Sequence, residues 1–185
     1  MSALPSVIDL GPAEEAERLW LGSLEAREDA GNDLAALCEA LELGVRAVEV
    51  LAVHKLMAVK EHFPATVQAQ LETPAPDVDA LRDAVHVPNC LEFTAILDLL
   101  SSEDLDCVSP GMHRGWEDRR FACKRSRVTA REALDVTLDA DAREKLLVLA
   151  AYRNRIFRTP PPLRLVPLQI LNAFGALDRM KEALG

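Results

Sequence analysis

The sequence predicts an all-α protein, a single helical bundle of five to seven helices. Apolar residues recur at the three- and four-residue spacing of a helix along most of the chain, and no useful stretch alternates with the period of a strand. Leu, Ala and Val dominate while aromatics make up 4% of the residues, a composition suited to close helix packing. We expect residues 1–11 to be a flexible lead-in and residues 12–185 to form one helical domain.

The first two helices are expected to form a hairpin. Pro12 suits the first position of a helix that runs to Asp29. Asn32 or Asp33 can cap the next helix, whose apolar stripe continues over 33–63. The fold is expected to be built on this long helix. Its polar residues are expected to form a solvated strip, made of Glu39, Glu42, Arg46, Glu49 and Lys60.

The second half of the chain is predicted to add shorter helices. Residues 72–78 have the composition of a linker, and residues 101–112 are rich in turn formers. Thr129 and Glu132 have the spacing of a capping box, which predicts a helix start. That helix either runs unbroken to Phe157 or bends near 139–141. The helices expected in this half cover 79–87, 89–100, 129–157 and 168–184.

The charge is unevenly divided along the chain. Residues 1–106 carry 6 Lys and Arg against 21 Asp and Glu, whereas residues 107–185 carry 15 against 9. This asymmetry predicts either that the two halves attract each other or that the basic half meets a polyanion.

Several function classes lack their sequence signatures. The chain has no glycine-rich phosphate loop and no Gly-x-Ser-x-Gly elbow. The four cysteines have no zinc-site spacing, so we expect no metal and no cofactor. No run approaches the roughly 18 apolar residues of a membrane span, and Met1–Gly11 lacks the features of a secretory signal. We therefore expect no membrane association and a cytoplasmic location.

An arginine lies on the apolar face of the predicted 129–157 helix. Arg153 follows Leu146, Leu149 and Ala150 at helical spacing, and Phe157 continues the face. Because a guanidinium stays protonated, burying it without a partner costs several kcal/mol or more. We therefore expect a carboxylate, a second subunit or a phosphate to face Arg153.

The segment that begins at Arg153 resembles a known site. Arg153-Asn154, late in an apolar helix that is followed by another amphipathic helix, is similar to the Arg-Asn-x-x-x-His signature of HEPN domains. In that family, the Arg and His of two protomers meet at a dimer interface and cleave RNA without a metal. The resemblance implies catalytic positions at Arg153, Asn154 and Arg158 and a homodimer through the helix that carries Arg153. It also implies RNA as a ligand and a role in a bacterial toxin–antitoxin or antiviral defence system, with an antitoxin or another protein as partner.

The sequence departs from this signature where the family has its histidine. Arg158 occupies that position, and a guanidinium can grip a phosphate but cannot shuttle a proton. Metal-independent endoribonuclease activity is therefore in question, and the sequence alone leaves open whether Arg158 is natural or an inactivating change. The alternative hypothesis is a non-enzymatic helical interaction or adaptor protein whose arginines make structural ion pairs. Arg153 would then pair with a carboxylate of the long helix, which offers Glu39, Glu42 and Glu49.

A second basic segment precedes Val128. Its cations are interleaved with Trp116 and Phe121, a pattern that suits either a nucleic-acid backbone with stacked bases or docking onto the acidic N-terminal half. The residues predicted to bind RNA are Arg114, Arg119, Arg120, Lys124, Arg125, Arg127 and, from the motif helix, Arg155.

Overall fold

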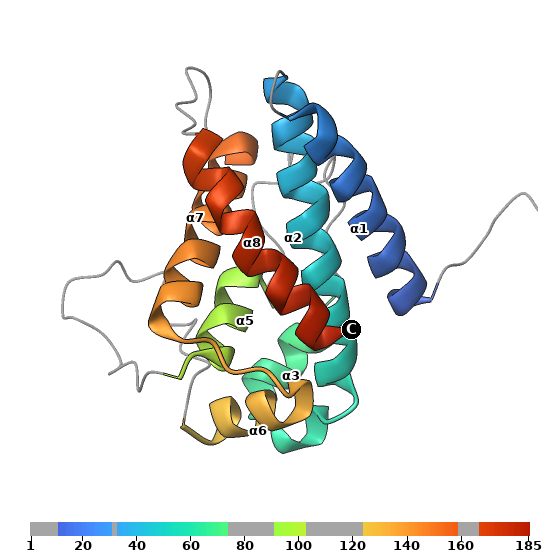
Figure 1. Cartoon of the computed structure of the whole chain (residues 1–185). Coiled ribbons are helices and arrows are strands. Elements are labelled where there is room, and N and C mark those ends of the chain that lie inside the picture. The colour runs from blue at the N-terminus through green and yellow to red at the C-terminus, as the bar shows by residue number, and fades with distance from the viewer. Residues whose placement is uncertain (1–10, 31–32, 74–90, 103–123, 159–166) are drawn as a thin grey trace, which may run out of the picture.

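The protein is all-α, as the sequence predicts. The structure, a computed structural model, describes residues 11–30, 33–73, 91–102, 124–158 and 167–185. Within these ranges there is no β-strand, and Ser101 and Leu138 form an isolated β-bridge. The described α-helices (Figure 1) are α1 (Pro12–Asp29), α2 (Leu34–Met57), α3 (Ala65–Glu72), α5 (Phe93–Leu100), α6 (Lys124–Leu134), α7 (Ala140–Arg158) and α8 (Pro167–Leu184).

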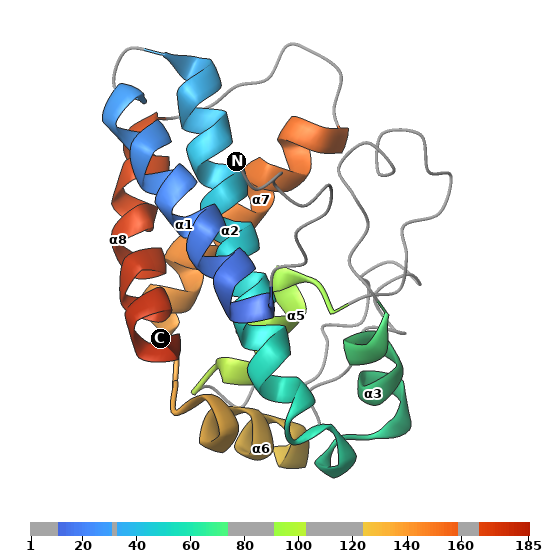
Figure 2. The same ribbon diagram turned by 90° about the vertical axis from the view of Figure 1, so that its right-hand side faces the viewer.

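Helix α2 is the central element of the bundle. It contacts each of the other described α-helices, with α1 along one side and α8 crossing in front of it in Figure 1. Figure 2 shows α3 and α6 together at the end of the bundle where α2 stops. The apolar stripe predicted for α2 is buried from Leu37 to Leu56, whereas Leu34 at its start is exposed, and buried residues from all these helices belong to one hydrophobic core. The stripe residues that are less than 2% exposed are Leu37, Leu41, Val45, Val48, Ala52 and Leu56.

The predicted starts of the first two helices are confirmed. Pro12 is the first residue of α1, and the Glu14 carboxylate accepts a hydrogen bond from the N–H of Gly11 at 2.9 Å. Asp33 is the N-cap of α2, and its carboxylate accepts from the N–H of Ala35 at 2.8 Å. Both carboxylates satisfy backbone donors that have no partner inside the helix.

The long helix ends earlier than predicted. Helix α2 stops at Met57 rather than at Phe63, and a 3₁₀ turn over Lys60–His62 follows it. Pro64 excludes the helical conformation at the preceding residue, and Phe63 is extended, with φ −91° and ψ 156°. The turn places Phe63 in the core, where it is 4% exposed, and α3 begins directly after Pro64. The sequence analysis did not predict α3.

The helix predicted over 129–157 is in fact two helices. Helix α6 already includes Lys124, so Thr129 lies inside a helix and the capping-box prediction is wrong. The chain leaves α6 at Asp135, which has a positive φ of 53°. Helix α7 starts at Ala140, where the Asp139 carboxylate accepts from the N–H of Ala142 at 2.8 Å. The local cap at Asp139 explains why the break falls near the predicted bend.

The three remaining helix predictions differ in outcome. The last helix, expected over 168–184, is confirmed as α8. The helix expected over 89–100 begins at Phe93 instead, because residues 91–92 are not helical. The helix predicted over 79–87 lies outside the described residues.

Candidate functional site

Helix α7 directs Arg153 toward the interior of the bundle. Leu146, Leu149 and Ala150, which precede it on the same face, are all buried. The Arg153 side chain itself is only 19% exposed. The periodicity therefore located a cation at a core-facing position correctly.

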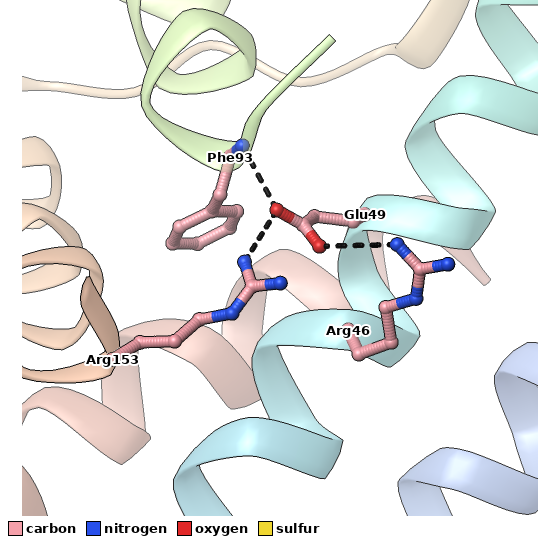
Figure 3. Close-up of polar contacts among 4 residues, drawn as sticks. All are labelled: Arg46, Glu49, Phe93 and Arg153. Atoms are coloured by element: carbon pink, nitrogen blue, oxygen red, sulfur yellow. Dashed lines mark hydrogen bonds and ion pairs between the residues drawn. The ribbon is translucent and has the colours of Figure 1, made fainter. Parts of the chain in front are cut away.

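A buried carboxylate from α2 neutralises this cation. Nη1 of Arg153 donates to Oε1 of Glu49 at 2.6 Å, and the Glu49 side chain is 8% exposed (Figure 3). Among the carboxylates expected to pair with Arg153, the structure identifies Glu49. The prediction that Glu49 belongs to a solvated strip is wrong, because α5 and α7 cover this part of α2.

The same carboxylate also holds the start of α5. Oε1 of Glu49 accepts a hydrogen bond from the N–H of Phe93 at 2.9 Å (Figure 3). Phe93 is the first residue of α5, and Glu92 at the N-cap makes no side-chain cap bond of its own. Glu49 thus supplies from α2 the acceptor and the negative charge that a helix N-terminus favours.

A second arginine completes the cluster from within α2. Nη1 of Arg46 lies 3.7 Å from Oε2 of Glu49, one helical turn away (Figure 3). The Glu49 carboxylate therefore has two cations and one backbone donor around it, and it joins α2, α5 and α7. We call Arg46, Glu49, Phe93 and Arg153 the Glu49 junction.

The local field keeps Arg153 charged. Burial alone would lower the pKa of the guanidinium, but the charge of Glu49 and its hydrogen bond raise that pKa above its ordinary value. Glu42 and Glu92 add smaller contributions in the same direction. The surroundings of Arg153 are therefore acidic, which stabilises a cation and repels a phosphate.

The other predicted catalytic and motif residues lie in the last turns of α7. Helix α7 extends through Asn154 and Arg155 to Arg158, and the side chains of these three residues lie outside the part that the structure describes.

The basic segment is described only at its end. Arg114, Arg119 and Arg120 are outside the described residues, and Lys124 and Arg125 are described only as backbone in the first turn of α6. Arg127 is described fully and is 5% exposed, with interactions inside the protein. The Arg127 guanidinium is therefore not accessible to a ligand in solvent.

Sequence reasoning did not single out Arg27 of α1, whose side chain is 14% exposed. Its guanidinium carbon lies 4.0 Å from the centre of the Phe174 ring and 5.0 Å from that of Trp20. Nη1 donates to Oδ1 of Asp178 in α8 at 2.6 Å. The available signal was the seven-residue spacing from Trp20 to Arg27, which places both side chains on one helical face.

The described part of the chain holds neither a cluster of metal-ligating side chains nor a membrane-spanning helix. There, no group of three or more His, Cys, Asp or Glu side chains is placed to hold a metal ion. No described helix has the length and apolarity required to cross a membrane.

Comparison with protein-family models, with curated proteins and with solved structures finds no match to this chain. The HEPN resemblance therefore rests on the residues of the Arg153 segment alone.

Proposed function

We propose that this chain is a non-enzymatic helical interaction protein in which Arg153 has a structural role. The observation that carries the proposal is the ion pair of Arg153 with Glu49, formed inside one chain and almost closed to solvent. The guanidinium that the HEPN resemblance assigns to phosphate binding already has a carboxylate partner at 2.6 Å.

The energetic cost of breaking the ion pair opposes phosphate binding by Arg153. If Arg153 left Glu49 to bind an RNA phosphate, this carboxylate, which is 8% exposed, would be buried with one cation fewer. Removing one partner of a buried ion pair costs about 3–5 kcal/mol. Glu42 and Glu92 would also repel the incoming phosphate. A structural role involves neither cost.

Arg158, the last residue of α7, supports the same proposal. Arg158, at the position of the family's histidine, cannot accept or donate a proton near neutral pH. At the last position of α7 a cation is also favoured by the helix dipole, which accounts for Arg158 without any ligand.

The second candidate is the HEPN-like RNA-binding or ribonuclease-derived protein of a bacterial defence system. One observation favours it: Arg153, Asn154 and Arg158 lie in the last turns of α7, and the amphipathic helix α8 follows, as the resemblance implies. In this hypothesis a homodimer through α7 would bring two motifs together, and an antitoxin or another protein would be the partner.

An RNA assay distinguishes the two candidates. The natural chain, Arg158→His and Arg153→Met are incubated with generic single-stranded RNA, and cleavage and binding are measured beside the free energy of unfolding. We expect no cleavage by any of the three proteins and no loss of RNA binding in Arg153→Met. We expect Arg153→Met to lower the unfolding free energy. Arg179→Met is the matched control, because it removes the same charge from an exposed position on α8.

Two outcomes of the RNA assay would contradict the structural role of Arg153. RNA cleavage by Arg158→His that disappears in the double variant with Arg153→Met would refute the structural role and establish the ribonuclease-derived function. RNA binding by the natural chain that depends on Arg153 and not on Arg179 would refute it as well.

A further inference from the structure

Exposed leucines gather on two helices of the bundle. Leu21 and Leu24 of α1 are 51% and 40% exposed, and Leu168 and Leu171 of α8 are 67% and 44% exposed. The other exposed large hydrophobic residues in the described ranges are Leu34 of α2 and Val128 of α6. Single exposed leucines need no explanation, whereas several on adjoining elements indicate a contact surface.

Side-chain interactions connect α1 and α8, the two helices that carry these leucines. Two ion pairs join them, Arg27 with Asp178 at 2.6 Å and Lys181 with Glu17 at 3.0 Å. In Figure 1, α1 and α8 lie on either side of α2, and both ion pairs involve the C-terminal half of α8.

Two of the leucines, Leu24 and Leu171, lie close to the contact between the two helices. Leu24 lies three residues before Arg27, and Leu171 lies three residues before Phe174, whose ring Arg27 covers at 4.0 Å. Each leucine is thus one turn from the same contact. A Cβ added to Gly175 would meet only Nη1 of Arg179, at 3.9 Å, so the surface beside Leu171 is open. We call Leu21, Leu24, Leu168 and Leu171 the leucine face.

The border of the leucine face on α1 is acidic. Glu17, Leu21, Leu24 and Glu28 follow one another at intervals of four, three and four residues, which places them on one side of the helix. The two cations of α1 are Arg18 and Arg27, and each already pairs with a carboxylate. The exposed carboxylates of α1 are Glu14, Glu17, Glu25, Glu28 and Asp29.

We propose that the leucine face binds an amphipathic helix of another protein whose apolar stripe is bordered by lysines or arginines. The leucines would supply apolar contact area, and the carboxylates of α1 would select a basic border. A second copy of this chain fits α1 less well, because α1 carries six carboxylates against two cations, and in a contact between two copies of α1 these carboxylates would face each other. The inference rests on the proposed function and names the chemistry of the partner.

Selection from a displayed library of helical peptides tests this inference. The full-length natural protein is the bait, and the double variant Leu24→Glu/Leu171→Glu is used for counter-selection. We expect the retained peptides to carry a leucine-rich stripe and net positive charge. By fluorescence anisotropy, their affinity should fall at least about tenfold in the double variant and fall as salt is raised.

Two further variants control this experiment. Val128→Glu introduces the same charge at an exposed apolar residue of α6 and should leave the affinity unchanged. Glu25→Lys/Glu28→Lys keeps every leucine and should weaken the binding of basic peptides, which makes the test independent of whether Leu24→Glu/Leu171→Glu folds. Circular dichroism establishes the fold of each variant.

Three results would overturn the inference: no selected peptide that binds, selected peptides that are neutral or acidic, or affinities that both double variants leave unchanged. A dimer of the natural chain that Leu24→Glu/Leu171→Glu converts to a monomer would also overturn it and assign the face to self-association. Failure here, with RNA still uncleaved, would leave the proposed function standing with a different contact surface. RNA cleavage by Arg158→His would refute the proposed function whatever the peptides do.

Discussion

Two largely buried arginines, Arg153 and Arg27, are stabilised in different ways. Arg153 of α7 pairs with a carboxylate that is 8% exposed, and that carboxylate is also the cap of α5. Arg27 of α1 pairs with Asp178, which is 42% exposed, and places its planar guanidinium against Trp20 and Phe174. Its Nε and Nη2 atoms are buried without a hydrogen-bond partner.

This difference indicates where the bundle depends on charge and where it depends on packing. At the Glu49 junction both charges are withdrawn from water, so each requires the other. At Arg27 the aromatic faces and a carboxylate in contact with solvent share the stabilisation, and either can be lost at a smaller cost. The four predictions below test this difference, beginning with the largest expected effect.

Loss of Glu49 should be the most damaging change at either arginine. We expect Glu49→Ala to lower the free energy of unfolding by about 3–5 kcal/mol, because Arg153 stays buried with its charge and the N–H of Phe93 loses its acceptor. Urea denaturation followed by circular dichroism measures this value. Asp178→Ala is the matched control at the other arginine, and an equal loss there would show that the two sites do not differ.

Removing both charges of the buried pair should cost less than removing one. We expect Glu49→Gln/Arg153→Met to be more stable than Arg153→Met alone by about 1–2 kcal/mol, because the glutamine still accepts from Phe93 and no buried carboxylate is left with one cation fewer. Arg46, which loses its partner, is 31% exposed and stays solvated. A double-mutant cycle by chemical denaturation provides the coupling energy. Additive losses would mean that Glu49 and Arg153 contribute independently.

The packing around Arg27 should be sensitive to a single methyl group. A Cβ on Gly44 would lie 2.7 Å from Oγ of Ser23 and 3.1 Å from Cδ2 of Leu177, between α1, α2 and α8. We expect Gly44→Ala to lower the unfolding free energy by about 1–3 kcal/mol despite the better helix propensity of alanine. Gly175→Ala, in the open part of α8, should instead raise it by up to about 1 kcal/mol. Equal effects at the two glycines would contradict the close approach at Gly44.

The smallest effects are expected at Arg27 and its carboxylate. We expect Arg27→Met to cost about 1–2 kcal/mol, since the loss of the ring contacts is partly offset by the removal of two buried N–H groups without acceptors. Asp178→Asn should cost about 1 kcal/mol or less and should matter less at high salt. Thermal unfolding at two salt concentrations measures both, and a loss at Arg27 larger than that of Glu49→Ala would reverse the comparison.

The sequence predicted the fold class and several helix ends because those features depend on neighbouring residues. The apolar stripe of α2, the start of α1 at Pro12 and the extent of α8 all follow from spacing and capping within one helix. The errors occurred where a distant contact outweighs a local signal. Phe63 leaves the helix to enter the core, and Glu49 is buried because α5 and α7 cover it.

The candidate site likewise has features that local sequence predicts and features that depend on distant contacts. Helical periodicity was sufficient to place Arg153 toward the core and to require an anion opposite it. It could not choose among the carboxylates of α2, because Glu49 and Arg153 are 104 positions apart and only the packing of α7 on α2 brings them together. The cap that Glu49 provides to α5 had no sequence signal, since a donor from one helix and an acceptor from another share no local pattern.

The sequence by itself predicted an all-α bundle, because apolar residues follow the 3.6-residue period of a helix. It also predicted an arginine that needs a partner, because an unpaired buried cation is costly. The three-dimensional packing of α2, α5 and α7 determines that Glu49 is the carboxylate that pairs with Arg153. The same packing determines that Glu49 also caps α5. Ion pairs and hydrogen bonds act over a few ångströms in space, and separation along the chain does not enter them.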